Sequence, residues 1–331
     1  MKPYLFAPLL ILLLTACNSG PVANDAIDAG LRKTIAANNE ILVDGMWRNP
    51  ARSLKRLGTE RFNEKDADEA IGIARAVYFQ PDLPHTYTVV DEYYSEDNGG
   101  GEIKITSEKY GFSYTFRSNR PECYISVLKI HPNEQQDYLV FALYNKNEGK
   151  GDWKLDKFLT ARYAFYGKNA ADMLALAQKW EKKGFTIDAL IHSYVAYKLT
   201  VYGGKDLKFD INKEIAAYHN DLLEKVHEKY GKLPFTINSI STHPQIADFD
   251  MAFLEGKFYP TVHYITGADE YDIETRHKEY EAVKNYVKRK MPDLASNQRY
   301  VIYRTFAAAD EYGELRLLQA FMDENKGRDT K

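Results

Sequence analysis

Two short stretches in the last third of the chain carry residue types that could bind zinc or perform acid–base chemistry. The stretch THPQIADFD holds His243, Asp248 and Asp250, and the stretch TVHYITGADE holds His263. Imidazole and carboxylate groups are zinc ligands and also act as general acids and bases. These four side chains could meet if the two segments pair, although their spacing matches no metal-binding motif. They are the candidate residues of a hydrolase that acts on glycan or peptide.

The motifs that identify several large enzyme classes are missing from the sequence. The chain has no phosphate loop G-x-x-x-x-G-K-[ST], no zinc helix H-E-x-x-H, no elbow G-x-S-x-G and no dinucleotide turn G-x-G-x-x-G. The classes that depend on these motifs lose support, whereas an enzyme whose residues converge only in the folded chain does not. We therefore expect no cofactor and no metal, and we favour a protein without a catalytic centre.

A second candidate site is the segment YGFSYTF. If this segment is a strand, one face presents Tyr110, Phe112, Tyr114 and Phe116, and the other face presents mainly small and polar side chains. Four rings on one face could form the floor of a cavity that binds a small ligand. The same pattern suits a sheet whose apolar face packs on a helix. The rings are thus the ligand-binding candidates of a small-ligand carrier.

The beginning of the chain predicts export. Lys2 precedes the apolar run from Tyr4 to Ala16, which as a helix would reach only ~20 Å, short of the ~30 Å hydrocarbon core of a bilayer. A charged start, a short apolar region and small residues before a cut are typical of a secretory signal peptide. Residues 1–16 are therefore expected to be a signal peptide and no membrane span.

The end of this run resembles the lipobox of bacterial lipoproteins in Leu14-Thr15-Ala16-Cys17. The resemblance implies that Cys17 receives a diacylglyceryl group and becomes the first residue of the mature chain, so the protein would be fastened to a membrane by lipid. In lipoproteins of enteric type an aspartate after the cysteine marks retention in the inner membrane. Asn18 therefore implies an outer-membrane address that faces the periplasm.

Charge and cysteine content narrow the set of partners. Loss of Lys2 with the signal reduces the 44 basic residues by one against 47 acidic ones, so the mature chain has a net charge of about −4. Nucleic acid is therefore not an expected partner. The basic cluster VKRK, which ends at Lys290, is expected to close a helix, or alternatively to contact anionic lipid. Cys123 remains the only other cysteine and is expected in a buried strand.

The sequence predicts a short tether over residues 17–24. Over residues 25–166 its patterns predict helices followed by an antiparallel meander. Short polar connections separate the expected strands. These strands are TYTVVDEYY, EIKITS, YGFSYTF, CYISVLKI, DYLVFALY and WKLDKFLTARYAFY. Over about residues 60–166 this order resembles the NTF2-like or cystatin-like α+β arrangement, in which a sheet wraps a helix and can leave a pocket.

Residues 167–232 predict a helical hairpin followed by a third helix. Asn169 and Thr186 can cap two helices joined at Gly184, and the spacing of small and aromatic residues in them resembles one tetratricopeptide-type repeat. A single repeat cannot bury its own face, so we expect the hairpin to dock on its neighbours. The third helix is expected over residues 211–230.

Residues 233–331 predict a second small α+β unit. Its expected strands are PFTINSIST, KFYPTVHYIT and YVIYRTFA, with a long helix over about 270–290 and a terminal helix. The chain as a whole is expected to be α+β, with more than one packed unit. We predict a lipid-anchored binding or assembly module with a protein partner in the cell envelope. The hydrolase and the small-ligand carrier remain the alternatives.

Overall fold

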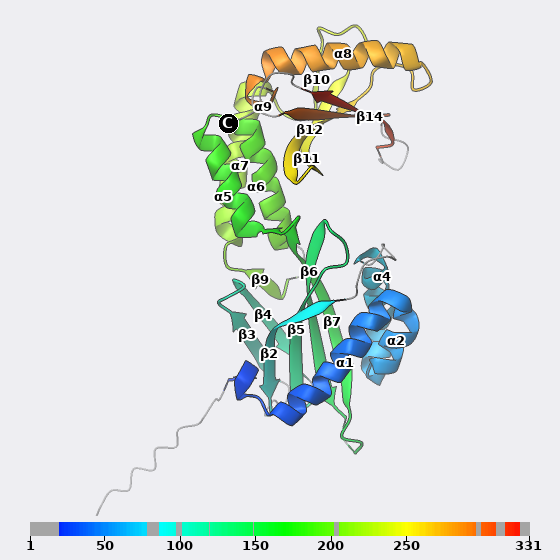
Figure 1. The fold of residues 1–331 in the computed structure, drawn as a ribbon, viewed down its shortest axis with the longest axis vertical. Coiled ribbons are helices and arrows are strands. Elements are labelled where there is room, and N and C mark those ends of the chain that lie inside the picture. Colours follow the sequence, from blue (N-terminus) through cyan, green and yellow to red (C-terminus); the bar gives the residue numbers. More distant parts are fainter. Residues whose placement is uncertain are drawn as a thin grey trace, which may run out of the picture.

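The computed structural model describes residues 20–77, 86–96, 101–118, 120–147, 149–201, 205–295, 299–308 and 315–324. This part of the chain is α+β, as predicted: helices pack on sheets whose strands are mainly antiparallel, with one parallel pair in the C-terminal sheet. Three regions follow one another along the molecule. They are an N-terminal unit of helices and two sheets, a group of three helices, and a C-terminal unit in which a long helix covers a sheet (Figure 1).

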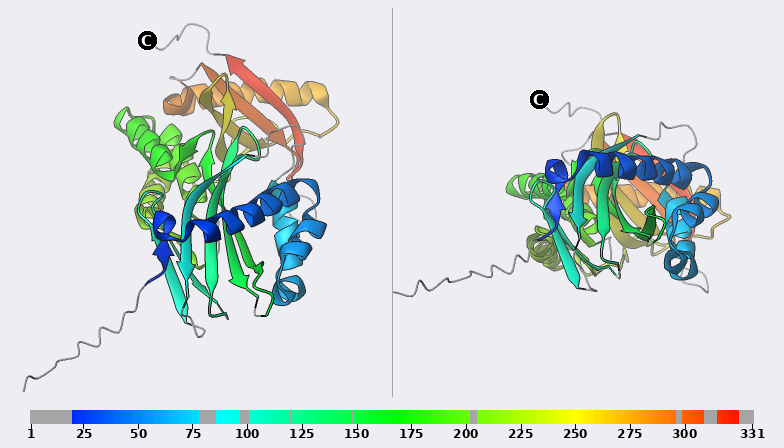
Figure 2. Two further views of the ribbon diagram at one scale, coloured as in Figure 1. Left: turned by 60° about the horizontal axis from the view of Figure 1, so that its bottom comes forward. Right: turned by 90° about the horizontal axis from the view of Figure 1, so that it is seen from below.

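Four helices cover one face of the main sheet of the N-terminal unit. They are α1 (Ala29–Arg48), α2 (Pro50–Leu57), α3 (Glu60–Lys65) and α4 (Ala67–Val77). Side chains cap three of them at the N-terminus: Asp28 accepts from Leu31 N, Asn49 from Arg52 N, and Thr59 from Phe62 N. Figure 2 shows α1 lying across the strands, so this helix can contact several of them at once.

The main sheet is antiparallel and has the order β1-β2-β5-β6-β7-β8. Its strands are β1 (Val22–Ala23), β2 (Tyr87–Ser95), β5 (Cys123–Ile130), β6 (Gln136–Lys146), β7 (Trp153–Phe165) and β8 (Lys168–Asn169). The predicted tether over 17–24 is therefore too long, because β1 already belongs to the sheet and a short 3-10 helix follows it at Asn24–Ala26.

A second sheet covers the other face of the main sheet and corrects the predicted meander. It has the order β3-β4-β9, with β3 (Glu102–Ser107), β4 (Phe112–Arg117) and β9 (Leu207–Phe209). The β3–β4 hairpin leaves the main sheet, so β2 pairs directly with β5. β9 comes from the segment between two later helices and ties the middle region to this unit. The core strands β5 and β6 are buried on both faces as a result.

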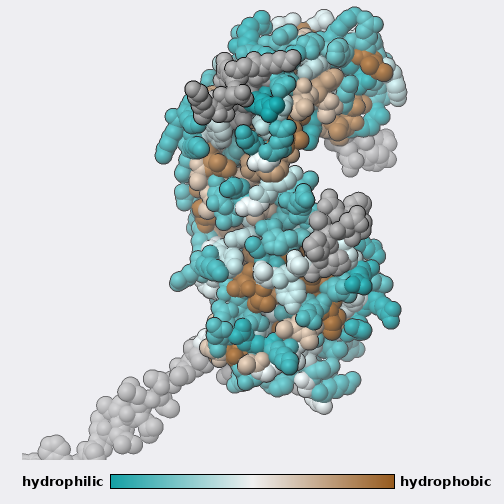
Figure 3. All heavy atoms as spheres, in the orientation of Figure 1, coloured by the Kyte–Doolittle hydropathy of each residue, from teal (hydrophilic) through white to brown (hydrophobic). Residues whose placement is uncertain are grey.

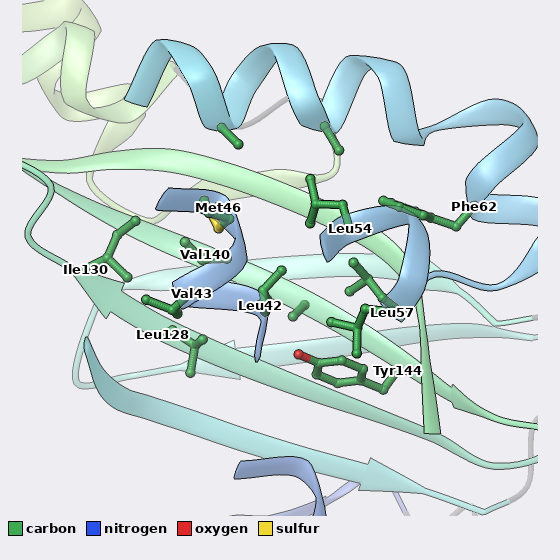
Figure 4. Packing of buried hydrophobic residues seen from close by; sticks show 14 of the residues in the cluster. Leu42, Val43, Met46, Leu54, Leu57, Phe62, Leu128, Ile130, Val140 and Tyr144 are labelled. Carbon is green, nitrogen blue, oxygen red and sulfur yellow. The ribbon is translucent and has the colours of Figure 1, made fainter. Parts of the chain in front are cut away.

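The core between the helices and the main sheet is largely apolar and contains a hydrogen-bonded group at Asn39. Figure 4 shows side chains from α1 and α2, such as Leu42 and Leu54, pointing toward Val140 and Tyr144 of β6. The Asn39 side chain, fully buried on α1, accepts from the Tyr144 hydroxyl at 2.9 Å and donates to the Ser126 hydroxyl at 2.9 Å. These bonds fix α1 on the sheet because a shift would leave buried polar groups without partners.

The aromatic strand faces the second core, which corrects the expected cavity floor. Phe112, Tyr114 and Phe116 are buried between the two sheets of the N-terminal unit. The ring of Phe141 lies 5.2 Å from those of both Phe112 and Tyr114. Packing on a second sheet, and not on a helix, fills the space that a ligand would need. Cys123 is buried in the same core, as predicted.

The middle region consists of α5 (Ala170–Lys182), α6 (Thr186–Val201) and α7 (Asn212–Tyr230). Gly184 has a φ of +82° and makes the turn between α5 and α6 at the predicted position. Asn169 and Asp172 form a capping box at the start of α5. The predicted docking of the hairpin is confirmed, since residues of α6 and α7 share a core with the C-terminal unit.

The C-terminal unit is a five-stranded sheet of order β10-β11-β12-β13-β14 covered by α8. Its elements are β10 (Phe235–Thr236), β11 (Gln245–Leu254), β12 (Lys257–Ile265), α8 (Ile273–Lys290), α9 (Pro292–Ala295), β13 (Tyr300–Phe306) and β14 (Leu317–Glu324). The predicted terminal helix is wrong: LLQAFMDE forms the edge strand β14, which pairs with β13. None of the helices in the described ranges is both long enough and apolar enough to cross a bilayer.

Candidate functional site

Four aromatic rings join the N-terminal and C-terminal units. Phe165 and Tyr166 come from the end of β7, and Phe253 and Phe258 come from the β11–β12 hairpin. Tyr166 stacks on Phe253 with ring centroids 3.8 Å apart, and Phe165 stacks on Phe258 at 6.1 Å. Large rings bury much apolar area with few rotatable bonds, so this contact fixes the relative position of the two units.

A pocket of about 310 Å³ lies where three regions of the chain meet, next to these rings. We call it the junction pocket. It is lined by Gln136, Arg162, Ala164 and Phe165 of the main sheet, by Tyr194, Val195, Lys198 and Leu199 of α6, and by Asp250 and Met251 of β11. Its volume lies at the lower end of the range typical of small-molecule sites, about 300–1,000 Å³. Figure 3 shows the surface hollowed between the two units.

The walls of the junction pocket combine charge with apolar surface. Arg162 and Lys198 bring two positive charges and Asp250 brings one negative charge. The Lys198 ammonium lies 5.0 Å from the centre of the Tyr194 ring, so the two side chains form a cation–π pair. Phe165 and Met251 are among the apolar lining residues. Such a pocket suits a small ligand with an apolar body and an acidic group.

The structure brings two of the four predicted His/Asp residues into direct register. The two segments pair as β11 and β12, with Asp248 opposite His263 and Asp250 opposite Thr261. His243 does not join them, because it lies exposed in the turn before β11, with a φ of +53°. Among the described residues, no hydrogen bond or ion pair connects any two of the four side chains. Only Asp250 reaches the junction pocket.

Desolvation shifts the pKa of two of these side chains, although Asp248 is exposed and His263 is half-buried. It lowers the pKa of the His263 imidazole; the Asp250 carboxylate opposes this effect, and Arg304 adds to it. The His263 Nε2 atom is buried without a hydrogen-bond partner. Desolvation raises the pKa of the Asp248 carboxyl, although the hydrogen bond from Phe249 N at 2.7 Å acts in the opposite direction. The direction of the His263 shift is the one that burial of an imidazole produces.

The lowered pKa of His263 predicts a pH-dependent stability. A histidine with a depressed pKa in the folded state contributes stability above the unfolded pKa of about 6.5, and this stability is lost as pH falls through the folded pKa. The free energy of unfolding should therefore fall below pH 6.5, and a His263→Asn variant should show a shallower decline. Chemical denaturation between pH 7.5 and 5 measures both slopes.

Gln245→Ala is the matched control, because it replaces an exposed, non-titrating residue on the same hairpin. This variant should keep the wild-type slope. Equal slopes in all three proteins would contradict the prediction.

The ring of Tyr110 lies at a different pocket, of about 250 Å³. This pocket is lined by the β3–β4 turn, by the start of α5 and by residues around Phe209, and the Tyr110 ring packs edge-on against Tyr163 at 5.8 Å. Its carboxylates, Glu108 and Asp210, oppose the charge of Lys109. The capping box already satisfies the first backbone donors of α5. We therefore regard the junction pocket as the better candidate site.

The residues of the junction pocket escaped the sequence analysis, apart from Asp250. Arg162 lies in a predicted strand and Lys198 in a predicted helix, and neither belongs to a motif. No signal in the sequence connects them, because their positions are separated by a helix and a turn. In the described part of the chain, no group of three or more His, Cys, Asp or Glu side chains is placed to hold a metal ion.

The lipobox lies outside the described residues, and so does its Cys17. Comparisons of the chain with protein-family models, with curated proteins and with solved structures found no match.

Proposed function

We propose that this protein is an exported lipoprotein, anchored through Cys17 in the outer membrane and facing the periplasm, that acts as a binding module. The lipobox at the end of the apolar N-terminal run supports the anchor. The observation that carries the binding role is the junction pocket, in which the main sheet, α6 and β11 together surround a cavity of about 310 Å³. A cavity that needs three regions of the chain depends on their fixed arrangement, which the stacked aromatic rings provide.

The ligand class follows from the lining. Phe165, Val195 and Met251 offer apolar contact, and Arg162 and Lys198 attract negative charge. Gln136 and the Tyr194 hydroxyl can exchange hydrogen bonds with a polar group of the ligand. The ligand we propose is therefore a small amphipathic acid, either free or as a side chain of a protein partner in the envelope.

Binding has more support than hydrolysis. A hydrolase would need an acid or base within hydrogen-bond reach of its partner group. His243 is remote from the others in register, and no hydrogen bond joins His263 to Asp248 or Asp250. The pair Asp248 and His263 remains the place where hydrolysis would have to be tested.

A charge reversal at Lys198 tests the proposed site. Anilinonaphthalene sulfonate is a small aromatic acid whose fluorescence rises in apolar surroundings, and we expect it to bind the full chain saturably. Lys198→Glu should weaken this binding by about tenfold or more, equivalent to ~1.4 kcal/mol, because it replaces an attractive charge by a repulsive one. Fluorescence titration measures the dissociation constants.

Lys179→Glu is the matched control, since Lys179 is an exposed lysine of α5 that does not line the pocket. It makes the same change in net charge and should bind the probe as the wild type does. If Lys198→Glu binds as tightly as the control, the ligand site lies elsewhere.

A further inference from the structure

The first residues after the predicted anchor are locked to the main sheet. β1 pairs with β2, with Val22 opposite Tyr94. Asn24 then adopts a φ of +50°, which asparagine tolerates better than most residues. Its side chain donates to Asp91 at 3.1 Å and accepts from the backbone N–H of Glu92 at 2.8 Å. The chain therefore cannot swing freely at this point.

Arg32 strengthens this attachment from the first turns of α1. Its guanidinium contacts Glu92 at 2.9 Å and Asp25 at 2.8 Å. Glu92 is only 4% exposed and also accepts from the Tyr124 hydroxyl at 2.6 Å. A buried carboxylate with two partners is costly to separate from either of them. The 3-10 helix, α1, β2 and β5 thus hold the N-terminal segment together.

The chain between Cys17 and Val22 is short. Five residues span at most about 18 Å when fully extended. If Cys17 is acylated, the edge formed by β1 and β2 must lie within that distance of the bilayer surface. The longer reach expected for an eight-residue tether does not apply, because β1 begins at Val22.

Strand directions show which end of the molecule this edge belongs to. Tyr94 of β2 lies opposite Tyr124 of β5, which lies opposite Tyr144 of β6. Tyr144 is close to the loop that connects β6 to β7. We call this the hairpin end. The junction pocket lies at the opposite end of the same strands, at Gln136. Eight residues of β6 separate Tyr144 from Gln136, a distance of about 26 Å.

The distribution of apolar and basic residues on the surface alone would favour the opposite orientation. Most of the large exposed apolar residues belong to the C-terminal unit, including Tyr271 at 81%, Ile273 at 67% and Met322 at 57%. The basic cluster 287–290 also lies there, at the end of α8, although Lys288 is paired with Asp323 at 2.7 Å. Composition alone would place this unit on an anionic membrane.

The N-terminal segment is fixed to the main sheet, and only five residues join Cys17 to Val22. We therefore infer that the hairpin end of the main sheet contacts the lipid surface, and that the junction pocket and the C-terminal unit are held on the aqueous side. The inference rests on the proposed anchor at Cys17. Charged side chains at the hairpin end include ion pairs, Lys146 with Glu122 at 2.7 Å and Arg117 with Glu102 at 2.9 Å. This end therefore suits a position at the headgroups, without insertion. A ligand or partner would then meet the pocket from the aqueous side.

Fluorescent probes on the acylated full chain in lipid vesicles test this orientation. Single cysteines would replace Lys150 at the hairpin end, Gln135 at the pocket end and Glu274 on α8, all of which are exposed. Burial raises the pKa of the Cys123 thiol to about 12, so the exposed thiols should react selectively. Vesicles of phosphatidylethanolamine and phosphatidylglycerol would carry a quencher on the lipid headgroup.

We expect the probe at Lys150→Cys to be quenched several-fold more strongly than those at Gln135→Cys and Glu274→Cys. Insertion of a twelve-residue Gly/Ser segment after Gly20 should reduce this difference, because the edge formed by β1 and β2 would no longer be held close to the bilayer. Equal or stronger quenching at Gln135→Cys or Glu274→Cys would overturn the orientation. A chain without lipid on Cys17 would overturn the anchor instead, so the two failures are distinguishable by mass spectrometry of the same sample.

Discussion

Cys17→Ala is expected to abolish incorporation of fatty acid into the protein. The thiol of Cys17 is the proposed attachment point, and the other cysteine of the sequence, Cys123, is buried in the core of the N-terminal unit. Each buried methylene contributes about 0.8 kcal/mol to membrane binding, and two or three acyl chains together hold a protein almost permanently. Metabolic labelling with a radioactive or alkyne fatty acid, followed by immunoprecipitation, measures the loss directly.

A second variant separates anchoring from export. If an ordinary cleavable signal peptide replaces residues 1–17, the chain should be exported, fold and appear in the soluble fraction of the envelope. The wild type should remain with the membranes after a high-salt wash, which removes proteins held by surface charge alone. Recovery of the replaced form in the membrane fraction would show that another part of the chain binds the membrane.

Phe112→Ala should lower the free energy of unfolding by about 3–5 kcal/mol. Phe112 is completely buried on β4, and its ring packs edge-on against Phe141 between the two sheets of the N-terminal unit. Removing the ring leaves a cavity that the neighbouring side chains can fill only in part. Urea denaturation followed by circular dichroism measures the change.

Tyr110→Ala is the matched control on the same stretch of chain. Tyr110 is half-buried and lies at the edge of the core, beside the smaller pocket. Its truncation should cost clearly less than that of Phe112. A Phe112→Ala variant as stable as the wild type would mean that this ring lines an open cavity, which is what a small-ligand carrier requires.

The strands of the N-terminal unit could be predicted from the sequence because their patterns are local. EIKITS and CYISVLKI coincide with β3 and β5, and the other four strands differ by a few residues at their ends. Their pairing could not be predicted in the same way. CYISVLKI and DYLVFALY are nearly continuous apolar runs, which indicates burial on both faces. We predicted a single meander from these runs, and nothing local in them identifies β3, β4 and β9 as the strands of a second layer.

The end of the chain shows how tertiary contacts override a local pattern. LLQAFMDE has residues that favour a helix, yet it forms β14, where its backbone pairs with β13. Phe321 then stacks on Tyr280 of α8 with ring centroids 4.0 Å apart. A strand at this edge packs the Phe321 ring against Tyr280 of α8. The sequence of the segment alone does not identify Tyr280 as its partner.

The candidate site was only partly predictable. The sequence indicated only that the four His/Asp side chains could meet if their two segments pair. The segments do pair, as β11 and β12, and Asp248 lies opposite His263. The junction pocket depends instead on the angle at which the C-terminal unit meets β7 and α6. That angle is set by the rings of Tyr166 and Phe253, which are 87 positions apart and belong to no repeat or motif.

Mass spectrometry of the N-terminal peptide shows whether Cys17 is the lipid-bearing first residue of the mature chain. The protein should be purified from envelopes of cells that express the full chain and then digested with a protease. We predict a peptide that begins at Cys17 and has the mass of a diacylglyceryl group, with or without a further acyl chain on its amino group. A peptide that begins at Met1, or one that contains an unmodified Cys17, would contradict the account.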